Sequence, residues 1–237
     1  QRDALKAAGE CYADYVNPFI GTDFTGNTYP GAQVPFGMVQ LSPDNGLPGW
    51  DRISGYFYPD STIAGFSHTH LSGTGAGDLY DISFMPVTLP YKEAEEPLGI
   101  HSRFSHADEA ASAGYYRVLL KDYDINVELT ATERCGIQRY TFPQTDAAVI
   151  LNLRKAMNWD FTEDSYVEKV DSVTIQGYRF SDGWARGQRI FFCTRFSRPF
   201  ETMQLDSAAV LKDGKRIGTS VIARFDFKTC LLYTSPS

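Results

Sequence analysis

Hydrophobic and polar residues alternate along most of the chain beyond about residue 115. In the stretch "DINVELTATE" every second residue is apolar, from Ile125 through Val127 and Leu129 to Ala131. Successive side chains of an extended backbone point to opposite faces, so this alternation predicts a half-buried β-strand. The same period recurs in four later groups, which are Val149/Leu151/Leu153, Val173/Ile175, Ile190/Phe192/Thr194/Phe196 and Val221/Ala223/Phe225/Phe227.

Turn signals separate these alternating segments. Pro143, Asp182-Gly183 and Asp213-Gly214 lie between them, and "VLKDGKRIG" is the clearest β-hairpin pattern in the chain. No helical pattern, with its period of about 3.6 residues, continues for more than about two turns. The chain is therefore predicted to be mainly β, a large two-sheet antiparallel β-sandwich rather than a series of βαβ units.

The first hundred residues have a different character. The stretch "NPFIGTDFTGNTYPGAQVPFGMVQLSPDNGLPGW" is dense in Gly, Pro, Asn, Asp, Ser, Thr and aromatic residues, which favour structured loops over long strands. Long loops in a compact protein are usually functional or covered by a partner. We therefore expect long structured N-terminal loops, with an apolar and aromatic face between residues 17 and 78 that promotes association when it is exposed.

Composition and charge narrow the class of ligand. The 237 residues are 43% hydrophobic and carry a net charge of −7 without a run of Lys and Arg, which argues against nucleic-acid and anionic-membrane partners. No apolar run reaches the roughly 18 to 20 residues of a membrane span. With Cys230 set aside, the remaining cysteines match neither a zinc pattern nor a disulfide framework; they are Cys11, Cys135 and Cys193. A neutral ligand fits this composition best.

The two ends of the chain are expected to lie outside the main domain. Residues 1–13 form an N-terminal extension in which "QRDALKAAGECYADY" lacks the apolar core of a signal peptide. Residues 14–227 form one β-sandwich domain. Residues 228–237 are expected to be a non-native tail, because "CLLYTSPS" resembles translated adapter sequence and follows the last predicted strand without turn residues.

The segment "GFSHTHLSGTGAGD", residues 65–78, has the most unusual composition. His68 and His70 point the same way on an extended backbone and could share one ligand. A zinc ion would need a third protein ligand, and none of the candidates has a diagnostic spacing; they are Asp78, Asp81, His101 and His106. Alternatively, each histidine donates a hydrogen bond that holds the glycine turn, or contacts a ligand.

The glycines of this segment, Gly73, Gly75 and Gly77, form a GxGxG run. A phosphate-binding loop should open a helix, whereas the following "DLYDISFMPV" resembles a strand. Close approach of the backbone to a ligand or to another chain segment is the better interpretation.

A second group of candidates interleaves aromatic and polar side chains from Trp50 to Tyr58. An aromatic ring can cover the apolar face of a sugar, while carboxylates and arginine bind its hydroxyls. A glycosidase also needs two carboxylates across the scissile bond. Asp51, Asp78 and Asp81 lie in the glycine-rich region, but no apolar environment marks any carboxylate as a proton donor. The chain is therefore expected to lack its own catalytic residues.

Three stretches together resemble the N-terminal β-sandwich domain of glycoside hydrolase family 92, the calcium-dependent exo-α-mannosidases common in gut Bacteroidetes. They are "YVNPFIGTDFTGNTYPGAQVPFGMVQLSPD", "GYFYPDSTIAGFSHTHLSGTGAGDLYDISFMPV" and "YRFSDGWARGQRIFFCTRFSRPF". The resemblance implies a secreted, periplasmic or cell-surface inverting enzyme of the α-1,2 type that removes terminal mannose from N-glycans or mannans. In this family a Glu and an Asp-assisted water act across roughly 6.5 to 9.5 Å.

The resemblance further implies that this domain packs on a C-terminal (α/α)6 barrel, which supplies the catalytic carboxylates and the calcium ligands. No catalytic residue or metal ligand is therefore assigned here. The resemblance makes Trp50 an aromatic wall near the leaving-group subsite, Arg52 a hydroxyl donor, and residues 68–78 the pocket floor. The expected substrate-binding residues are Trp50, Asp51, Arg52, His68, His70, Gly73, Gly75 and Asp78.

Two other functions remain open from the sequence. A free-standing carbohydrate-binding or interaction module would use the same loops without catalysis. A small zinc hydrolase would instead be built on His68 and His70.

Overall fold

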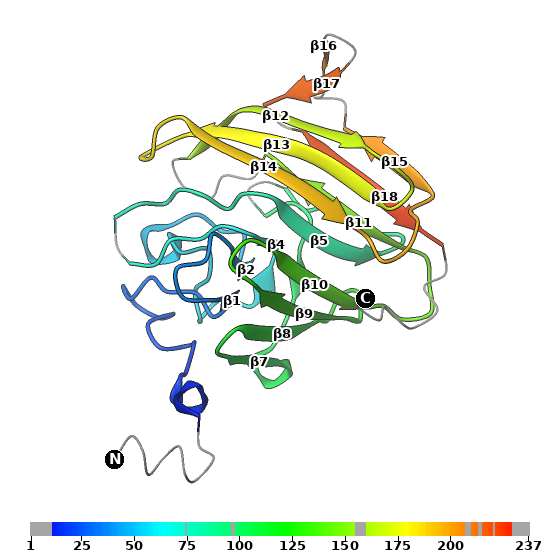
Figure 1. The fold of residues 1–237 in the computed structure, drawn as a ribbon. Coiled ribbons are helices and arrows are strands. Elements are labelled where there is room, and N and C mark those ends of the chain that lie inside the picture. The colour runs from blue at the N-terminus through cyan, green and yellow to red at the C-terminus, as the bar shows by residue number, and fades with distance from the viewer. Residues whose placement is uncertain are drawn as a thin grey trace.

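The computed structural model describes residues 11–73, 75–95, 98–154, 160–206, 210–212, 215–219 and 221–228 (Figure 1). Every strand pairing in this part of the chain is antiparallel, so the predicted mainly β, antiparallel fold is confirmed. Its helices are three short 3₁₀ turns, η1 (Tyr12–Tyr15), η2 (Trp50–Arg52) and η3 (His106–Asp108). None of the described helices has the length and apolar character needed to cross a bilayer.

The strands form three main sheets and one small pair. The central sheet has the order β1 (Ala32–Gln33), β2 (Gln40–Asp44), β4 (Gly65–Ser67), β5 (Ser83–Thr88), β11 (Ala147–Asn152), β18 (Ile222–Phe227), β15 (Thr202–Leu205). A four-stranded sheet has the order β10 (Gly136–Thr141), β9 (Ile125–Ala131), β8 (Tyr115–Leu120), β7 (Glu109–Ser112). A five-stranded sheet has the order β14 (Gln188–Arg195), β13 (Thr174–Asp182), β12 (Phe161–Lys169), β17 (Lys215–Gly218), β16 (Val210–Lys212). The strands β3 (Thr62–Ile63) and β6 (Ser102–Arg103) pair separately.

These sheets stack as three layers, with the central sheet between the other two (Figure 1). One hydrophobic core fills the space on the side of the four-stranded sheet and includes Ile150 and Val127. The other core lies on the side of the five-stranded sheet and includes Val149 and Ile175. The sequence therefore predicted the sandwich correctly but placed its residues in two large sheets, whereas three stack.

Strand β11 explains why a third layer forms. Val149 and Leu151 point into one core, while Ala148 and Ile150 point into the other, so both faces of the strand are apolar. A strand that is buried on both faces reads as a continuous apolar run. The alternation predicted for Val149, Leu151 and Leu153 was therefore only half of the pattern, because the intervening residues are buried as well.

The other alternating segments are confirmed as half-buried strands. Strand β9 buries Ile125, Val127, Leu129 and Ala131 on one face, and β18 likewise buries Ala223, Phe225 and Phe227. The hairpin predicted at "VLKDGKRIG" is present as the antiparallel pair β16–β17. Its turn residues, Asp213 and Gly214, lie outside the described residues, as do residues 1–10 of the predicted extension and residues 229–237 of the predicted tail.

The strand predicted at "DLYDISFMPV" begins later than its sequence suggests. Leu79, Tyr80 and Ile82 have positive φ angles of 84°, 64° and 55°, and strand β5 begins only at Ser83. Positive φ is uncommon in residues other than glycine and is a strain that the surrounding structure must hold in place. Residues 78–82 are therefore a shaped connection between the glycine-rich loop and the central sheet.

The N-terminal loops gather at one end of the sandwich, where the blue and cyan segments lie in Figure 1. Several large apolar side chains in these loops are exposed, namely Ile20, Phe24, Phe36, Met38 and Trp50. The segment from residue 17 to residue 78 thus exposes several large apolar side chains, as expected. Exposed apolar side chains of this kind are typical of a surface that meets a partner or a ligand.

Candidate functional site

Three loops converge at this end of the molecule and define the candidate site. The backbone N–H of Gly73 donates to the carbonyl of Asn27 at 2.6 Å. The Ser54 hydroxyl donates to the carbonyl of Thr28 at 3.0 Å. The Tyr80 hydroxyl donates to the carbonyl of Ile53. These hydrogen bonds join the first loop, the segment that follows Trp50 and the glycine-rich segment.

His70 holds this loop cluster from inside. Its ring is buried, and Nδ1 lies 2.7 Å from the carbonyl oxygen of Gln40. Its Nε2 lies 2.8 Å from Oδ1 of Asp44 and 3.2 Å from Oγ of Ser67. Both ring nitrogens are therefore engaged with the protein. These contacts fit the alternative in which His70 holds the turn, and a contact of His70 with sugar stays a prediction.

His68 lies nearer the surface and is only partly buried. Its Nδ1 is 2.8 Å from the carbonyl oxygen of Ile82, and its ring meets Phe84 edge to face at 5.8 Å. Burial lowers the pKa of His68, and the hydrogen bond to Ile82 opposes this shift. His68 is therefore held at the end of the central sheet in its neutral form, with Nδ1–H as the donor to Ile82.

This lowered pKa predicts a pH dependence of stability. Below about pH 6.5 the unfolded chain binds a proton at His68 that the folded chain does not, so stability should fall as pH falls. The substitution His68→Gln keeps an N–H donor and should reduce this slope, by at most about 1.4 kcal/mol per pH unit. Urea unfolding of both proteins between about pH 5 and 7.5 measures it. Equal slopes would contradict the assignment.

The glycines of the segment are needed for their backbone conformation. Gly73 and Gly75 have φ angles of +95° and +129°, where side chains are strained, and nothing lies within 4 Å of the position that a Cβ would take. The side on which a Cβ would point is therefore open at both positions, while the backbone N–H of Gly73 meets the carbonyl of Asn27 at 2.6 Å. Both residues are exposed, so their backbone presents open surface at the loop.

The two carboxylates that follow these glycines are buried. Asp78 Oδ2 accepts the backbone N–H of Ala185 at 2.7 Å, and Asp81 Oδ1 accepts from Nη1 of Arg179 at 2.6 Å. Arg179 is itself fully buried, and its Nη2 also donates to Asp160 at 2.8 Å. Asp78 has no exposed surface in this structure, so its carboxylate serves here to hold the loop, and its contact with sugar stays a prediction.

The segment around Trp50 remains at the surface. Trp50 is 52% exposed, and Asp51 is partly buried beside it. Arg52 forms a bidentate pair with Asp60, with Nε 2.6 Å and Nη2 2.5 Å from its oxygens. The Arg52 guanidinium also lies over the ring of Phe57, 4.6 Å from its centroid. Arg52 is therefore mainly held by the protein, and Trp50 is the more available of the two for a ligand.

Sequence reasoning missed the residues that hold these loops from other parts of the chain. Arg179 lies on β13, and Trp184 lies in the turn between β13 and β14 beside the residue bound by Asp78. The pair Asp182-Gly183 predicts a turn at this place but not its partners. A tryptophan directly after a turn glycine could have marked this turn as a second candidate.

The zinc hypothesis has no geometric support in the residues that the structure describes. Within them, no group of three His, Cys, Asp or Glu side chains is placed to hold a metal ion. The three cysteines among these residues, Cys11, Cys135 and Cys193, are free thiols.

Comparison with known proteins identifies relatives of this domain. The model of the glycosyl hydrolase family 92 N-terminal domain matches residues 15–231. The solved GH92 α-mannosidase BT3965 from Bacteroides thetaiotaomicron, in complex with mannoimidazole, is 37% identical with a TM-score of 0.83. The GH92 inverting mannosidase BT2199 from Bacteroides thetaiotaomicron is 26% identical with a TM-score of 0.72. A curated protein from Arthroderma benhamiae, described as an uncharacterized secreted glycosidase, is 29% identical over 143 residues.

The chain spans only part of the length of these relatives. The alignments with BT3965 and BT2199 cover 92% of this chain but 30% and 29% of those chains. The alignment with the Arthroderma benhamiae protein covers 56% of this chain and 18% of that protein. What these matches share with the chain is therefore one domain of a longer protein.

Proposed function

Because the chain belongs to glycosyl hydrolase family 92 and comprises its N-terminal domain, we propose that it forms part of the sugar pocket of an exo-acting, inverting α-mannosidase. In this proposal the loop end of the sandwich meets a C-terminal (α/α)6 catalytic domain, and the pocket lies in the seam between the two. The substrate is terminal mannose of N-glycans or mannans, joined by an α-1,2 linkage.

The observation that carries the proposal is the loop end itself. Trp50, exposed apolar residues and an open glycine backbone gather there, while buried hydrogen bonds hold the loops in place. Small-molecule sites are usually largely preformed and combine aromatic side chains with a few placed polar groups. The likeness to BT3965, whose structure was solved with mannoimidazole, supports mannose as the ligand class.

The proposal assigns binding to this chain and catalysis to the second domain. The buried carboxylates Asp78 and Asp81 are bonded to Ala185 and Arg179, so neither is placed to act on a substrate. The acid, the base and the calcium ligands would come from the catalytic domain. The secreted relative supports an extracellular, periplasmic or cell-surface location.

A domain exchange tests this proposal. The chain is fused in place of the N-terminal domain of BT3965, and hydrolysis of an aryl α-mannoside is measured. We expect a folded chimera with mannosidase activity and no activity from the chain alone. A folded, inactive chimera that still binds methyl α-mannoside would favour the alternative, a carbohydrate-binding module without catalysis. A chain that binds no mannoside in either form would contradict the proposed function.

Trp50 should contribute most of the aromatic contact from its own loop. In the chimera, Trp50→Ala should lower kcat/KM about tenfold, because the apolar face of the sugar loses its stacking partner. Val170→Ala is the control, since Val170 is comparably exposed but lies in the β12–β13 turn. Equal effects of the two substitutions on kcat/KM would argue against Trp50 as a sugar contact.

A further inference from the structure

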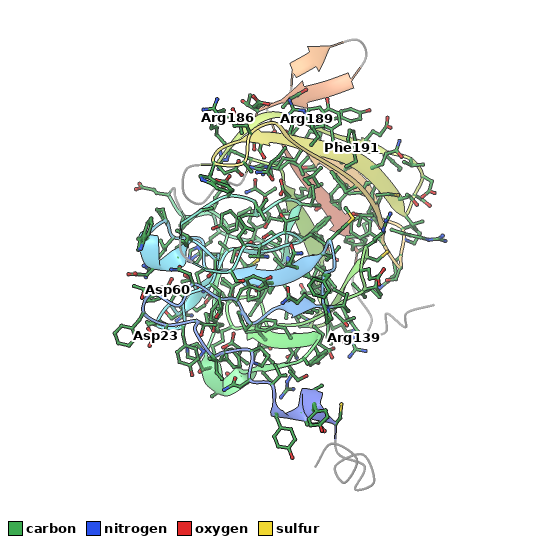
Figure 2. All side chains as sticks on the ribbon, turned by 60° about the vertical axis from the view of Figure 1, so that its left-hand side comes forward. Asp23, Asp60, Arg139, Arg186, Arg189 and Phe191 are labelled. Carbon is green, nitrogen blue, oxygen red and sulfur yellow. The ribbon has the colours of Figure 1, made fainter. Side chains whose placement is uncertain are left out.

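Trp184 is a strongly exposed aromatic residue that the proposed pocket has not yet used. It lies in the turn between β13 and β14, and its side chain is 72% exposed. Among the described residues no hydrogen bond or ring contact involves its indole. The turn lies at the same end of the sandwich as the N-terminal loops (Figure 1). Figure 2 labels Arg186 of the same turn at the top of the view, beside Arg189.

The turn is attached to the glycine-rich loop on both sides of Trp184. On one side, the backbone N–H of Ala185 donates to Oδ2 of Asp78 at 2.7 Å. On the other, Gly183 packs so closely on the same carboxylate that a Cβ would lie 2.8 Å from Asp78 Oδ1. Asp78 is fully buried, so this contact excludes water. The backbone on both sides of Trp184 is therefore held against Asp78, at the end of the glycine-rich loop.

A second attachment comes from the strand that leads into the turn. Arg179 donates to Asp81 at 2.6 Å and to the carbonyl of Leu79 at 3.4 Å. Leu79 and Asp81 belong to the segment with positive φ angles that connects the glycine-rich loop to β5. The five-stranded sheet thus holds this segment at two places, through Asp78 and through Asp81.

Joining two segments through a buried carboxylate costs free energy. The carboxylate must be desolvated, and an apolar contact of the same volume often gives equal or greater stability. What a hydrogen-bonded carboxylate adds is one defined geometry. Asp78 and Asp81 therefore fix the position of the turn on the loop more narrowly than packing alone.

We propose that Trp184 is a second sugar-stacking residue of the candidate site, positioned there by Asp78, and that its ligand is the apolar C–H face of a terminal α-mannoside. The inference rests on the proposed function, because it takes the open glycine loop as the floor of the sugar pocket. Trp50 and Trp184 then stand on two different segments that are both bonded to residues 78–80, through Ile53–Tyr80 and Ala185–Asp78.

The chain offers a direct test, because it contains three tryptophans, each of which gives one indole N–H signal in a ¹H–¹⁵N spectrum. Single Trp→Phe substitutions assign the three signals. Methyl α-mannoside is then titrated into the labelled 237-residue chain, with methyl α-galactoside as the stereochemical control. We expect the signals of Trp50 and Trp184 to shift together and to follow one dissociation constant.

The outcomes separate the two proposals. If the Trp50 signal shifts and the Trp184 signal does not, the proposed function stands and the inference about Trp184 is wrong. If neither signal shifts, the inference about Trp184 is wrong, and the chimera with the catalytic domain of BT3965 decides the proposed function. A shift of both signals by the galactoside to the same extent would mean nonspecific solvent effects and would also overturn the inference.

Substitutions provide the second measurement. Trp184→Ala should weaken methyl α-mannoside binding about three- to tenfold. Phe191→Ala is the matched control and should leave binding unchanged. Phe191 lies on the same hairpin and is 71% exposed, but its side chain projects from the more exposed face of strand β14. Gly183→Ala should shift the Trp184 signal without ligand, because its Cβ meets Asp78. Equal affinities of the Trp184 and Phe191 variants would overturn the proposal.

Discussion

Replacing Arg179 by leucine should lower the free energy of unfolding by about 3–5 kcal/mol, the largest loss that we expect from a single substitution in this chain. The reason is the burial of its partners. Arg179, Asp81 and Asp160 have no exposed side-chain surface, and the guanidinium lies 2.6 Å and 2.8 Å from the two carboxylates. Leucine would leave two buried carboxylates without a countercharge. Equilibrium unfolding in urea at neutral pH measures the loss.

A surface ion pair on the same sheet provides the control. Arg189 lies 3.1 Å from Glu163, and both side chains are about half exposed. Arg189→Leu should therefore cost only about 0–1 kcal/mol. If the two arginine variants lose the same stability, the interior ion pairs do not hold the five-stranded sheet to the loop, and the prediction is wrong.

The pH dependence of the Arg179→Leu variant gives an independent check. Burial raises the pKa of Asp160, and Arg179 opposes that shift. Without the guanidinium, the folded chain would bind a proton at Asp160 at a higher pH than the unfolded chain does. A raised folded-state pKa stabilises the fold at low pH, and this stabilisation is lost as pH rises through that pKa. The gap between variant and wild type should therefore narrow from neutral toward acidic pH.

The sequence predicted those parts of the fold that local patterns determine. The alternation of apolar and polar residues predicted strands such as β9 and β18, because each of these strands has one buried and one more exposed face. It found only half of β11, whose intervening residues Ala148 and Ile150 fill a second core. The continuous apolar run "AAVIL" is the signal of a strand buried on both faces, and it predicts a third layer when it is read that way.

The candidate site could be predicted in its surface residues but not in its supports. Trp50 and the glycine-rich segment were recognisable because their composition is unusual for a strand. Arg179 could not be recognised, because its partner Asp81 is 98 residues away in sequence and only the folded topology brings them together. Asp78 and its partner Ala185, which follows Trp184, are likewise far apart in sequence, so the roles of Asp78 and Trp184 could not be recognised either. Nothing in a local pattern tells a buried aspartate from one that lines a pocket.

Glu109, on strand β7 of the four-stranded sheet, supports the loop end as Arg179, on strand β13 of the five-stranded sheet, does. Its carboxylate is almost completely buried at the start of β7. It accepts from the hydroxyl of Tyr56 at 3.0 Å, from the hydroxyl of Tyr116 at 2.5 Å and from Nδ1 of His106 at 2.6 Å. Burial, together with the charge of Glu109, raises the pKa of Tyr116, so its phenol stays a donor. Tyr56 follows Trp50 by six residues, so this cluster fixes the loop that carries Trp50.

Glu109→Ala should therefore lower the free energy of unfolding by about 3 kcal/mol, because two buried phenols and an imidazole lose their acceptor. Glu109→Gln should lose less, since the amide oxygen can still accept from one or two of these donors. Glu128→Ala is the matched control. Glu128 also accepts from a tyrosine, at 2.6 Å from Tyr115, and pairs with Arg139, but this cluster lies at the surface, where Figure 2 labels Arg139. Its loss should stay near about 0–1 kcal/mol.

The same pair of variants connects stability to the candidate site. If Glu109 holds the Trp50 loop, the indole signal of Trp50 should broaden or move in Glu109→Gln at temperatures where the fold remains intact by circular dichroism, and methyl α-mannoside binding should weaken. Glu128→Ala should change neither, because its partners Tyr115 and Arg139 lie on strands β8 and β10 of the four-stranded sheet. An unchanged Trp50 signal in Glu109→Gln would mean that the loop keeps its shape without this carboxylate. The loops would then be held by their other buried contacts, among them those of His70 and Arg179.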